Sequence, residues 1–338
     1  MEPHPKPTSF IRTVLGDIAP SELGVCYAHE HIIIDPGSMT EQEPDFLIDS
    51  VDHAVQDLAQ FKADGGSAMI DCMPTGGRNP AKLAEVSRRT GVHIVCPTGL
   101  HLSRYYPEGH WGGTLSEAEL AEIFVAEIER GIMEPSGTGA EEGANQPQPL
   151  CRAGLIKIAS GLNALNGQER RLFRAAALAQ RRTGCPILTH TEQGTAALEQ
   201  IECLLSSGAR SGHIILSHTD RKPDLAYHRE ILQTGVSVEY DSAVRWKTDH
   251  DGPNPTLHLV LALAAEFPRQ IMLGMDAARR SYKVSYGGSP GMSYLLTTFR
   301  QRLLAAGLGP ELWNRIMIAN PASAFAFGVG SDSSPSLL

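Results

Sequence analysis

Gly154-Leu155-Ile156-Lys157-Ile158-Ala159 is an apolar run that is interrupted by a single lysine. Seven other runs of similar character recur along the chain, and most are rich in Val, Ile and Leu rather than alternating with polar residues. Continuous apolar runs of this length are typical of strands buried on both faces of a parallel sheet. The eight predicted strands are Val25 to Ile34, Ser67 to Met73, Val92 to Pro97, Gly154 to Ala159, Pro186 to Thr189, His213 to Ser217, Val236 to Tyr240 and Gln270 to Met275.

Segments with helical periodicity lie between these strands. Ser116 is a good N-cap because a glutamate stands at the third helical position after it, and Gly184 and Gly208 stand where two helices should stop. Eight successive strand-and-helix units predict an α/β fold, the (β/α)8 TIM barrel. The clearest predicted helices span Phe46 to Ala63, Glu117 to Ile132, Glu169 to Thr183 and Thr195 to Ser207.

The length of the chain fits one domain. A barrel of this type needs ~250 residues, and the 338 residues accommodate it at about 22–328 within a single domain 1–338. We expect the first ~20 residues to be a short N-terminal extension that covers the bottom of the barrel. The Gly- and Pro-rich tract Pro135 to Pro149 predicts a surface loop, and Ser331 to Leu338 predicts a flexible tail.

Composition argues against several kinds of partner. The formal net charge is −9 and no Lys/Arg run is present, so we expect no binding to nucleic acid or to a membrane surface. No apolar run approaches the ~18 residues that span a bilayer, and the first seven residues lack a signal-type apolar stretch. The six cysteines form no CxxC pair. They predict buried thiols in a reducing cytoplasm rather than a catalytic nucleophile.

Two histidines share one face of the first predicted strand. His29 and His31 flank Glu30, and residues two apart on a strand point the same way, ~6.6 Å apart along its axis. Both imidazoles can therefore reach one cation, while Glu30 points away towards the helices. Taken alone, the pair could equally be two structural histidines.

Three further strands end in metal-type side chains. His190 follows the fifth predicted strand, His218 the sixth and Asp276 the eighth. Barrel enzymes place catalytic residues at this carboxyl-terminal end of the strands. Each residue singly could be structural, but together they predict a two-metal site.

Lys157 is the unusual member of the set because it lies inside an apolar strand. An unpaired buried ammonium is costly, so burial favours the neutral amine. A neutral amine can add carbon dioxide and become a carbamate that bridges two metals. The alternative is a lysine that pairs with an acid inside the barrel.

A centre of this kind predicts hydrolysis. Two metals ~3.5–4 Å apart would share a hydroxide whose formation they favour at neutral pH. Asp276 would take the proton of that hydroxide and pass it to the leaving group. An ester, lactone, amide or phosphoester could be the substrate. The ligand types suit Zn and also Mn, Co or Fe.

The chain resembles the phosphotriesterase family of the amidohydrolase superfamily. The resemblance runs from Thr13-Val14-Leu15-Gly16 to Asn320-Pro321-Ala322 and rests on Leu23-Gly24, His29-Glu30-His31, the Lys157 strand, His190, His218-Thr219-Asp220-Arg221 and Asp276. It implies that His29, His31 and Asp276 hold the more buried metal and that His190 and His218 hold the more exposed one. It also implies that Lys157 bridges them as N6-carboxylysine.

Other segments look like the branch of this family that opens phosphorylated sugar lactones. They are Thr98-Gly99-Leu100-His101, Tyr105-Tyr106, Asp220 to Asp224, Tyr227-His228, Tyr240-Asp241, Arg245-Trp246-Lys247, Ala278 to Tyr282 and Tyr286 to Gly291. Two positions depart from that branch, because Leu102 stands where a lysine is usual and Ser242 where a glycine is. Because of both departures, the substrate could also be a related anionic lactone or a less polar one.

The resemblance implies a cationic barrel mouth that binds a substrate phosphate or carboxylate, although about half of these cations could be solvated loop charges. They are Arg221, Arg245, Lys247, Arg279, Arg280 and Lys283. His101 and Tyr105 would line the pocket. The alternative for His101 is that it is only a capping residue.

Three hypotheses follow. The first is a lactonase for an anionic, sugar-derived lactone. The second keeps the metals but cleaves a phosphotriester or an N-acyl amide. The third is a binding protein without catalysis on a barrel frame. A homodimer is plausible by analogy alone.

Overall fold

The computed structural model describes residues 9–133, 151–246 and 253–328. The predicted loop at Pro135 to Pro149, the predicted tail at Ser331 to Leu338 and Lys247 lie outside the described residues. Among the described residues, no helix is both long enough and apolar enough to cross a membrane.

The predicted parallel barrel is confirmed. Hydrogen-bonded pairing runs without a break from β3 to β5 and from β6 to β11, and every one of these pairs is parallel. Only Cys96 separates β5 from β6, so the two form one bent third strand. The backbone N–H of Asp276 donates to the carbonyl of His29 at 3.1 Å and closes the circle. The strands are β3 (Cys26–Glu30), β4 (Ala68–Asp71), β5 (His93–Val95), β6 (Pro97–Gly99), β7 (Leu155–Ser160), β8 (Ile187–Thr191), β9 (Ile214–Ser217), β10 (Ser237–Tyr240) and β11 (Ile271–Leu273).

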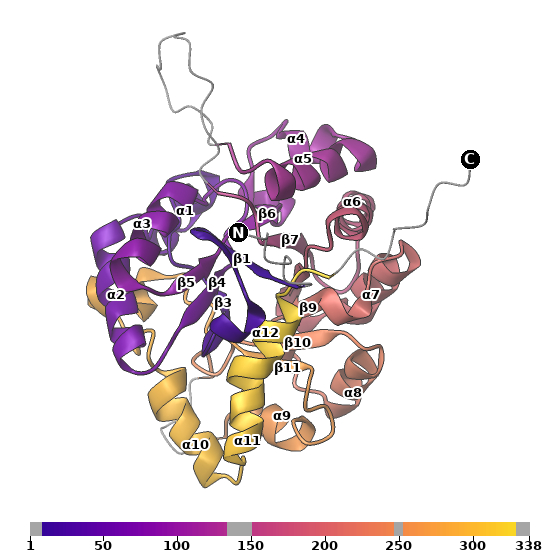
Figure 1. The fold of residues 1–338 in the computed structure, drawn as a ribbon. Coiled ribbons are helices and arrows are strands. Elements are labelled where there is room, and N and C mark those ends of the chain that lie inside the picture. The colour runs from indigo at the N-terminus through magenta and orange to yellow at the C-terminus, as the bar shows by residue number, and fades with distance from the viewer. Residues whose placement is uncertain (1–8, 134–150, 247–252, 329–338) are drawn as a thin grey trace, which may run out of the picture.

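Helices surround the strands as an outer ring (Figure 1). The α-helices are α1 (Ser38–Gln42), α2 (Val51–Ala63), α3 (Pro80–Thr90), α4 (Trp111–Thr114), α5 (Glu117–Glu129), α6 (Gly167–Thr183), α7 (Ala197–Ser206), α8 (Leu225–Gln233), α9 (Pro255–Leu263), α10 (Arg300–Ala305), α11 (Pro310–Asn314) and α12 (Asn320–Ala324). The π-helical segment η9 (Leu295–Phe299) leads directly into α10, and the π-helical segment η10 (Arg315–Ala319) connects α11 to α12. Short 3₁₀ turns are η1 (Pro20–Glu22), η2 (Pro44–Phe46), η3 (Ser103–Tyr105), η4 (Glu192–Gly194), η5 (Ser211–His213), η6 (Thr219–Arg221), η7 (Arg280–Tyr282) and η8 (Val284–Tyr286).

Capping chemistry explains where the predicted helices begin and end. Ser116 and Glu119 form the expected reciprocal cap of α5, with Ser116 N donating to Glu119 Oε2 at 2.8 Å. Gly184 ends α6 in the left-handed conformation, at φ 72°. The predicted start at Phe46 was wrong, because Ser50 is the N-cap and α2 begins at Val51. The other predicted bounds lie within three residues of the observed ones, and the start at Glu117 and the end at Thr183 are identical.

The N-terminal extension closes one end of the barrel, as predicted for the part that the structure describes. β1 (Ile11–Thr13) and β2 (Gly16–Ile18) form an antiparallel hairpin that lies across the barrel in Figure 1. Ile11 and Phe325 pack against the side chains that fill the barrel interior, including Val95, Leu155 and Met272. Burial of this apolar cluster fixes the strands that carry the site at the opposite end.

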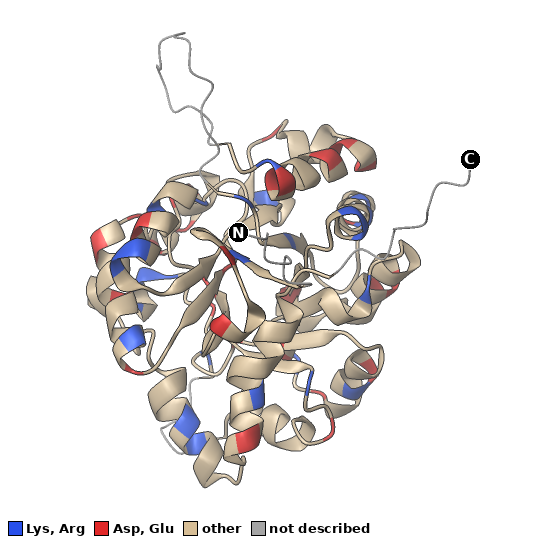
Figure 2. Cartoon of the chain, in the orientation of Figure 1, with Lys and Arg blue, Asp and Glu red and all other residues tan. Residues whose placement is uncertain are grey.

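Charged side chains lie mainly on the outer helices (Figure 2). Acidic residues of α5 lie beside basic residues of α6, and Arg174 Nε is 2.7 Å from Glu117 Oε2. Exposed pairs of this kind stabilise the fold only slightly. The two helices flank the strands that lead to His101 and Lys157, so they support one wall of the site.

Candidate metal centre and catalytic cavity

Five of the six predicted ligands gather around one cavity of about 180 Å³. They are His29, His31, His190, His218 and Asp276, and all five are buried. The ring centroids of His29 and His218 are 4.7 Å apart, and those of His190 and His218 are 4.6 Å apart. His31 Nε2 lies 3.3 Å from Asp276 Oδ1. Side chains from β3 and β8, and from the residues that follow β3, β9 and β11, therefore converge at one point, as the barrel topology predicts.

Backbone strain accompanies two of these side chains. His218 has φ 66° and Asp276 has φ 47°, which is the left-handed region that non-glycine residues rarely adopt. Asp276 was predicted to end the eighth strand, but β11 stops at Leu273, and Asp276 lies three residues beyond it. Strained conformations of this kind cost about 1–3 kcal/mol each and cluster at functional sites.

Lys157 is buried inside the barrel wall and is 1% exposed. It is the third of six residues in β7, so the prediction that it lies inside an apolar strand is confirmed. Its Nζ has no hydrogen-bond partner among the described residues. Burial lowers the pKa of the Lys157 amine, as the sequence argument requires. Gly99 allows the neighbouring strand to approach, because a Cβ there would lie 1.9 Å from the carbonyl oxygen of Lys157.

Burial favours the neutral form of His29, His190 and His218. Burial lowers the pKa of His29 and of His218 well below the ordinary value, and it lowers the pKa of His190 to about 4. The hydrogen bond to Glu192 partly opposes this effect at His190, whose Nε2 is 2.9 Å from Glu192 Oε2. Neutral imidazoles are the form that binds divalent metals.

Two buried carboxylates near these histidines were missed by sequence reasoning. Asp241 Oδ2 lies 2.5 Å from His218 Nδ1, and Glu239 Oε2 lies 3.4 Å from His29 Nδ1. Within the described ranges, two groups have metal-ligand spacing: His29, His218 and Asp241 form one, and His29, His31 and Asp276 form the other. A signal was available, because Glu239 is a charged residue in an apolar strand, as Lys157 is.

Two arginines converge on Asp276. Arg221 Nη2 donates to Asp276 Oδ2 at 2.9 Å, and Arg245 Nη2 donates to the same oxygen at 2.5 Å. Burial raises the pKa of Asp276, but Arg245 and the hydrogen bond from His31 outweigh it, and this pKa lies well below its ordinary value. The carboxylate is therefore ionised.

The remaining cations have different locations. Arg279 lines the cavity, although its Nη1 is also 3.3 Å from Glu43 Oε2. Arg104, which the sequence analysis did not select, lines it too. Arg280 does not line the cavity, because its Nε donates to the carbonyl of Leu47. Lys283 was expected at the barrel mouth, but this prediction was wrong. The residue is only 2% exposed, and its Nζ donates to the carbonyl of His31 at 2.8 Å.

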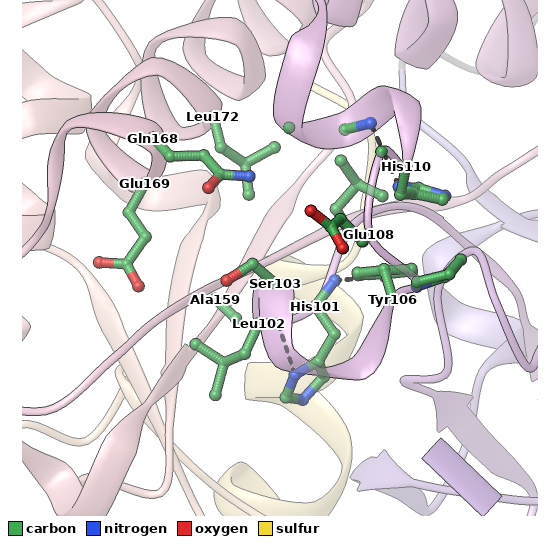
Figure 3. A pocket seen from close by; sticks show the side chains of 15 residues that line it. His101, Leu102, Ser103, Tyr106, Glu108, His110, Ala159, Gln168, Glu169 and Leu172 are labelled. Carbon is green, nitrogen blue, oxygen red and sulfur yellow. Dashed lines mark hydrogen bonds between the residues drawn. The ribbon is translucent and has the colours of Figure 1, made fainter. Parts of the chain in front are cut away.

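His101 and Tyr105 both line the cavity, as predicted. The His101 ring centroid is 4.9 Å from that of His190. His101 Nδ1 also accepts a hydrogen bond from the backbone of Leu102 at 2.8 Å, so the capping alternative describes part of its role. A second pocket of about 220 Å³ lies beside His101. Figure 3 shows Leu102 and Leu172 among the side chains that line it.

Comparison with known proteins agrees with this geometry. The chain matches the phosphotriesterase family over residues 9–325. It is 31% identical to a phospho-furanose lactonase of Mycoplasmopsis synoviae (strain 53), over 94% of this chain and 92% of that protein. It is 27% identical to an N-acetyltaurine hydrolase of Rattus norvegicus, over 94% of this chain and 98% of that protein.

Among solved structures, the chain is similar to a lactonase from Listeria monocytogenes. The TM-score is 0.84 at 30% identity, and the match covers 94% of this chain and 99% of that one. The family match and the structural similarity both cover nearly the whole described chain, and the clustered histidines lie within that match. The protein therefore belongs to the phosphotriesterase family, whose members are metal-dependent hydrolases.

Proposed function

We propose that this protein is a binuclear metal-dependent hydrolase that opens the ring of an anionic sugar lactone, with a phosphorylated lactone as the first choice. The observation that carries the proposal is the convergence of four buried histidines and an ionised Asp276 on a cavity that arginines line. The phospho-furanose lactonase and the lactonase among its relatives support the same reaction class.

The residues present fit two divalent metals. His29, His31 and Asp276 would hold one ion, His190 and His218 the other, and carboxylated Lys157 would bridge them. Support comes from buried polar atoms without a hydrogen-bond partner in the described chain, namely His31 Nδ1 and Lys157 Nζ. A carbamate on Lys157 would turn an unsatisfied amine into an anionic ligand. We propose zinc first, with Mn, Co or Fe as alternatives, because all accept this ligand set.

When bound, the metals would supply an activated water-derived nucleophile and polarise the lactone carbonyl. The protein's own part is proton transfer and orientation. Asp276 is ionised, so its carboxylate can accept a proton, although the contacts with His31, Arg221 and Arg245 make it a weak base. We propose that Asp276 passes this proton to the ring oxygen as the carbon–oxygen bond breaks. Arg221 and Arg245 would hold the carboxylate in position throughout.

Charge at the cavity favours an anionic substrate. Arg104, Arg221, Arg245 and Arg279 line it, and a guanidinium recognises phosphate or carboxylate with paired hydrogen bonds. Leu102 stands where the lactonase branch usually has a lysine, and it is buried and lines the neighbouring pocket rather than this cavity. We propose His101 and Tyr105 as contacts for the sugar part, and we withdraw Arg280 and Lys283 from the substrate contacts because of their positions.

The test is a set of parallel rates on zinc- and manganese-loaded protein. We expect turnover of a phosphorylated furanose lactone to exceed that of the unphosphorylated lactone, an aryl phosphotriester and an N-acyl amino acid. Faster cleavage of the triester or the amide would replace the lactone assignment with the second hypothesis. Full lactone turnover by protein freed of metal would contradict the proposed chemistry altogether.

Three further features are proposals of the same kind. We propose a single domain over residues 1–338, a homodimer by analogy, and a cytoplasmic location. The six cysteines are free thiols, which fits a reducing compartment. We also propose that the binding partner of this protein is a small-molecule substrate.

A further inference from the structure

Glu239 is a fully buried carboxylate whose role the proposed reaction does not explain. It lies on β10 and is 0% exposed. Neither carboxylate oxygen accepts a hydrogen bond from a donor within the described part of the chain. Asp241 adjoins it, so the two carboxyl groups can share a hydrogen bond only when one of them carries a proton. Two adjoining buried acids destabilise a fold unless something else compensates them.

Glu239 lies against the proposed metal ligands on the side away from Asp276. Its Oε2 is 3.4 Å from His29 Nδ1, whereas His29 Nε2 is 3.8 Å from Asp276 Oδ1. Ser217 Oγ is closer to His29 Nδ1, at 2.8 Å, and makes the direct hydrogen bond. Glu239 is therefore not needed to satisfy the imidazole. Burial and the adjoining Asp241 raise the pKa of Glu239 well above its ordinary value, so a negative charge on this carboxylate is costly here unless bound cations offset it.

The fold makes room for this carboxylate. Gly274 follows β11 beside Glu239, and a Cβ at Gly274 would lie 2.6 Å from Glu239 Oε1. The same Cβ would lie 2.8 Å from the backbone N and O of His29. Any side chain at Gly274 would displace either the carboxylate or the strand that carries His29. The acid thus occupies a space that the barrel keeps open for it.

The charges of the proposed centre are out of balance without Glu239. Two divalent ions carry four positive charges, whereas the six proposed ligands offer two negative charges, from Asp276 and carboxylated Lys157. Arg221 and Arg245 add positive charge at the mouth. Glu239 and Asp241 are the fully buried carboxylates nearest His29 Nδ1. Charge of this sign in a low-dielectric interior strengthens the binding of cations.

We propose that Glu239 is a positioning residue that raises the affinity of the centre for divalent cations without coordinating them. The protein would retain an acid that destabilises its metal-free state because that acid stabilises the metal-bound state. Two opposite effects follow for one substitution. Removal of the carboxylate should stabilise the metal-free protein and weaken metal binding.

The experiment compares Glu239→Met and Glu239→Gln with the parent protein. Zinc affinity is measured by competition with a chromophoric chelator in bicarbonate buffer, and thermal unfolding is measured after chelation. We expect the zinc Kd of Glu239→Met to rise about tenfold or more. We expect its metal-free Tm to rise by about 2 °C or more. Glu239→Gln should weaken zinc binding similarly, because it removes the charge and keeps the shape.

The matched control is Asp57→Asn. Asp57 is also buried, but it accepts hydrogen bonds from Ser285 N and Ser285 Oγ, at 3.0 and 2.7 Å. This variant should lose thermal stability and keep the parent zinc affinity. The proposal is overturned if Glu239→Met binds zinc within twofold of the parent, or if it unfolds at a lower temperature or fails to fold.

This inference rests on the metal centre of the proposed function, but the two can fail separately. A parent protein that binds no zinc would remove the centre itself. A parent that binds zinc but cleaves no lactone would leave the role of Glu239 intact, because neither measurement uses a substrate.

Discussion

Arg221 donates a hydrogen bond from Nη2 to Asp276 Oδ2 at 2.9 Å, although the two residues are 55 positions apart in the chain. Arg221 comes from the turn after β9, and Asp276 comes from the segment after β11. The same Nη2 is 3.0 Å from His218 Nδ1, so one guanidinium contacts two proposed ligands. Arg221 therefore holds the side chains of His218 and Asp276 in position before any substrate binds.

The central catalytic prediction concerns Asp276→Asn. An amide cannot accept the proton that the reaction releases, so lactone turnover should fall by about 100-fold or more. Metal analysis should still find zinc, because His29 and His31 remain for one ion and His190 and His218 for the other. Activity within tenfold of the parent would show that another group moves the proton.

Neighbouring arginines offer a matched pair for substrate recognition. Arg279 lines the cavity and Arg280 does not. Arg279→Met should therefore raise the KM for a phosphorylated lactone by about fivefold or more, which corresponds to the loss of one charged hydrogen bond. Arg280→Met should leave KM within twofold. Equal effects of the two variants would contradict the assignment of Arg279 to the substrate.

Two buried lysines test the carbamate. Lys157 has no hydrogen-bond partner in the part of the chain that the structure describes, whereas Lys283 donates to the carbonyl of His31. Lys157→Met should abolish the mass increment of one carbon dioxide in native mass spectra and should weaken zinc binding, with no loss of metal-free stability. Lys283→Met should keep the increment but unfold at a lower temperature. An unmodified Lys157 in zinc-loaded parent protein would exclude the carbamate.

Acid should destabilise the metal-free protein through His190. Burial lowers the pKa of this histidine from 6.5 to about 4. Between these values the unfolded chain binds a proton that the folded chain does not, so the free energy of unfolding falls as pH falls from 6.5 towards 4. Urea unfolding at several pH values should show a shallower dependence in His190→Asn. An unchanged dependence would mean that His190 titrates alike in both states.

Much of this site was predictable because the end of each strand can be recognised from the local sequence, and the barrel brings those ends together. His190 and His218 each follow an apolar run, and parallel strands in a barrel bring such positions to the same end. Lys157 was identified by the cost of burying a charge. These inferences need only the period of a strand, the parallel direction of the strands and the cost of a buried charge.

Other parts were not predictable because they depend on contacts between distant loops. Arg280 and Lys283 look like mouth cations in the sequence, yet one is held by the carbonyl of Leu47 and the other by that of His31. Asp241 and Arg104 reach the site only through the fold of the segments after β10 and β6. The shift of the α2 start from Phe46 to Val51 likewise depends on Ser50, whose hydroxyl accepts from His53 N at 3.4 Å.

Metal stoichiometry tests the central claim most directly. The protein is freed of metal, saturated with zinc in bicarbonate buffer, separated from excess ion and measured by elemental analysis. The account predicts two zinc ions per chain, with both lost in a variant that replaces His29, His31, His190 and His218 by alanine. Less than one zinc ion per chain in the parent protein would contradict it.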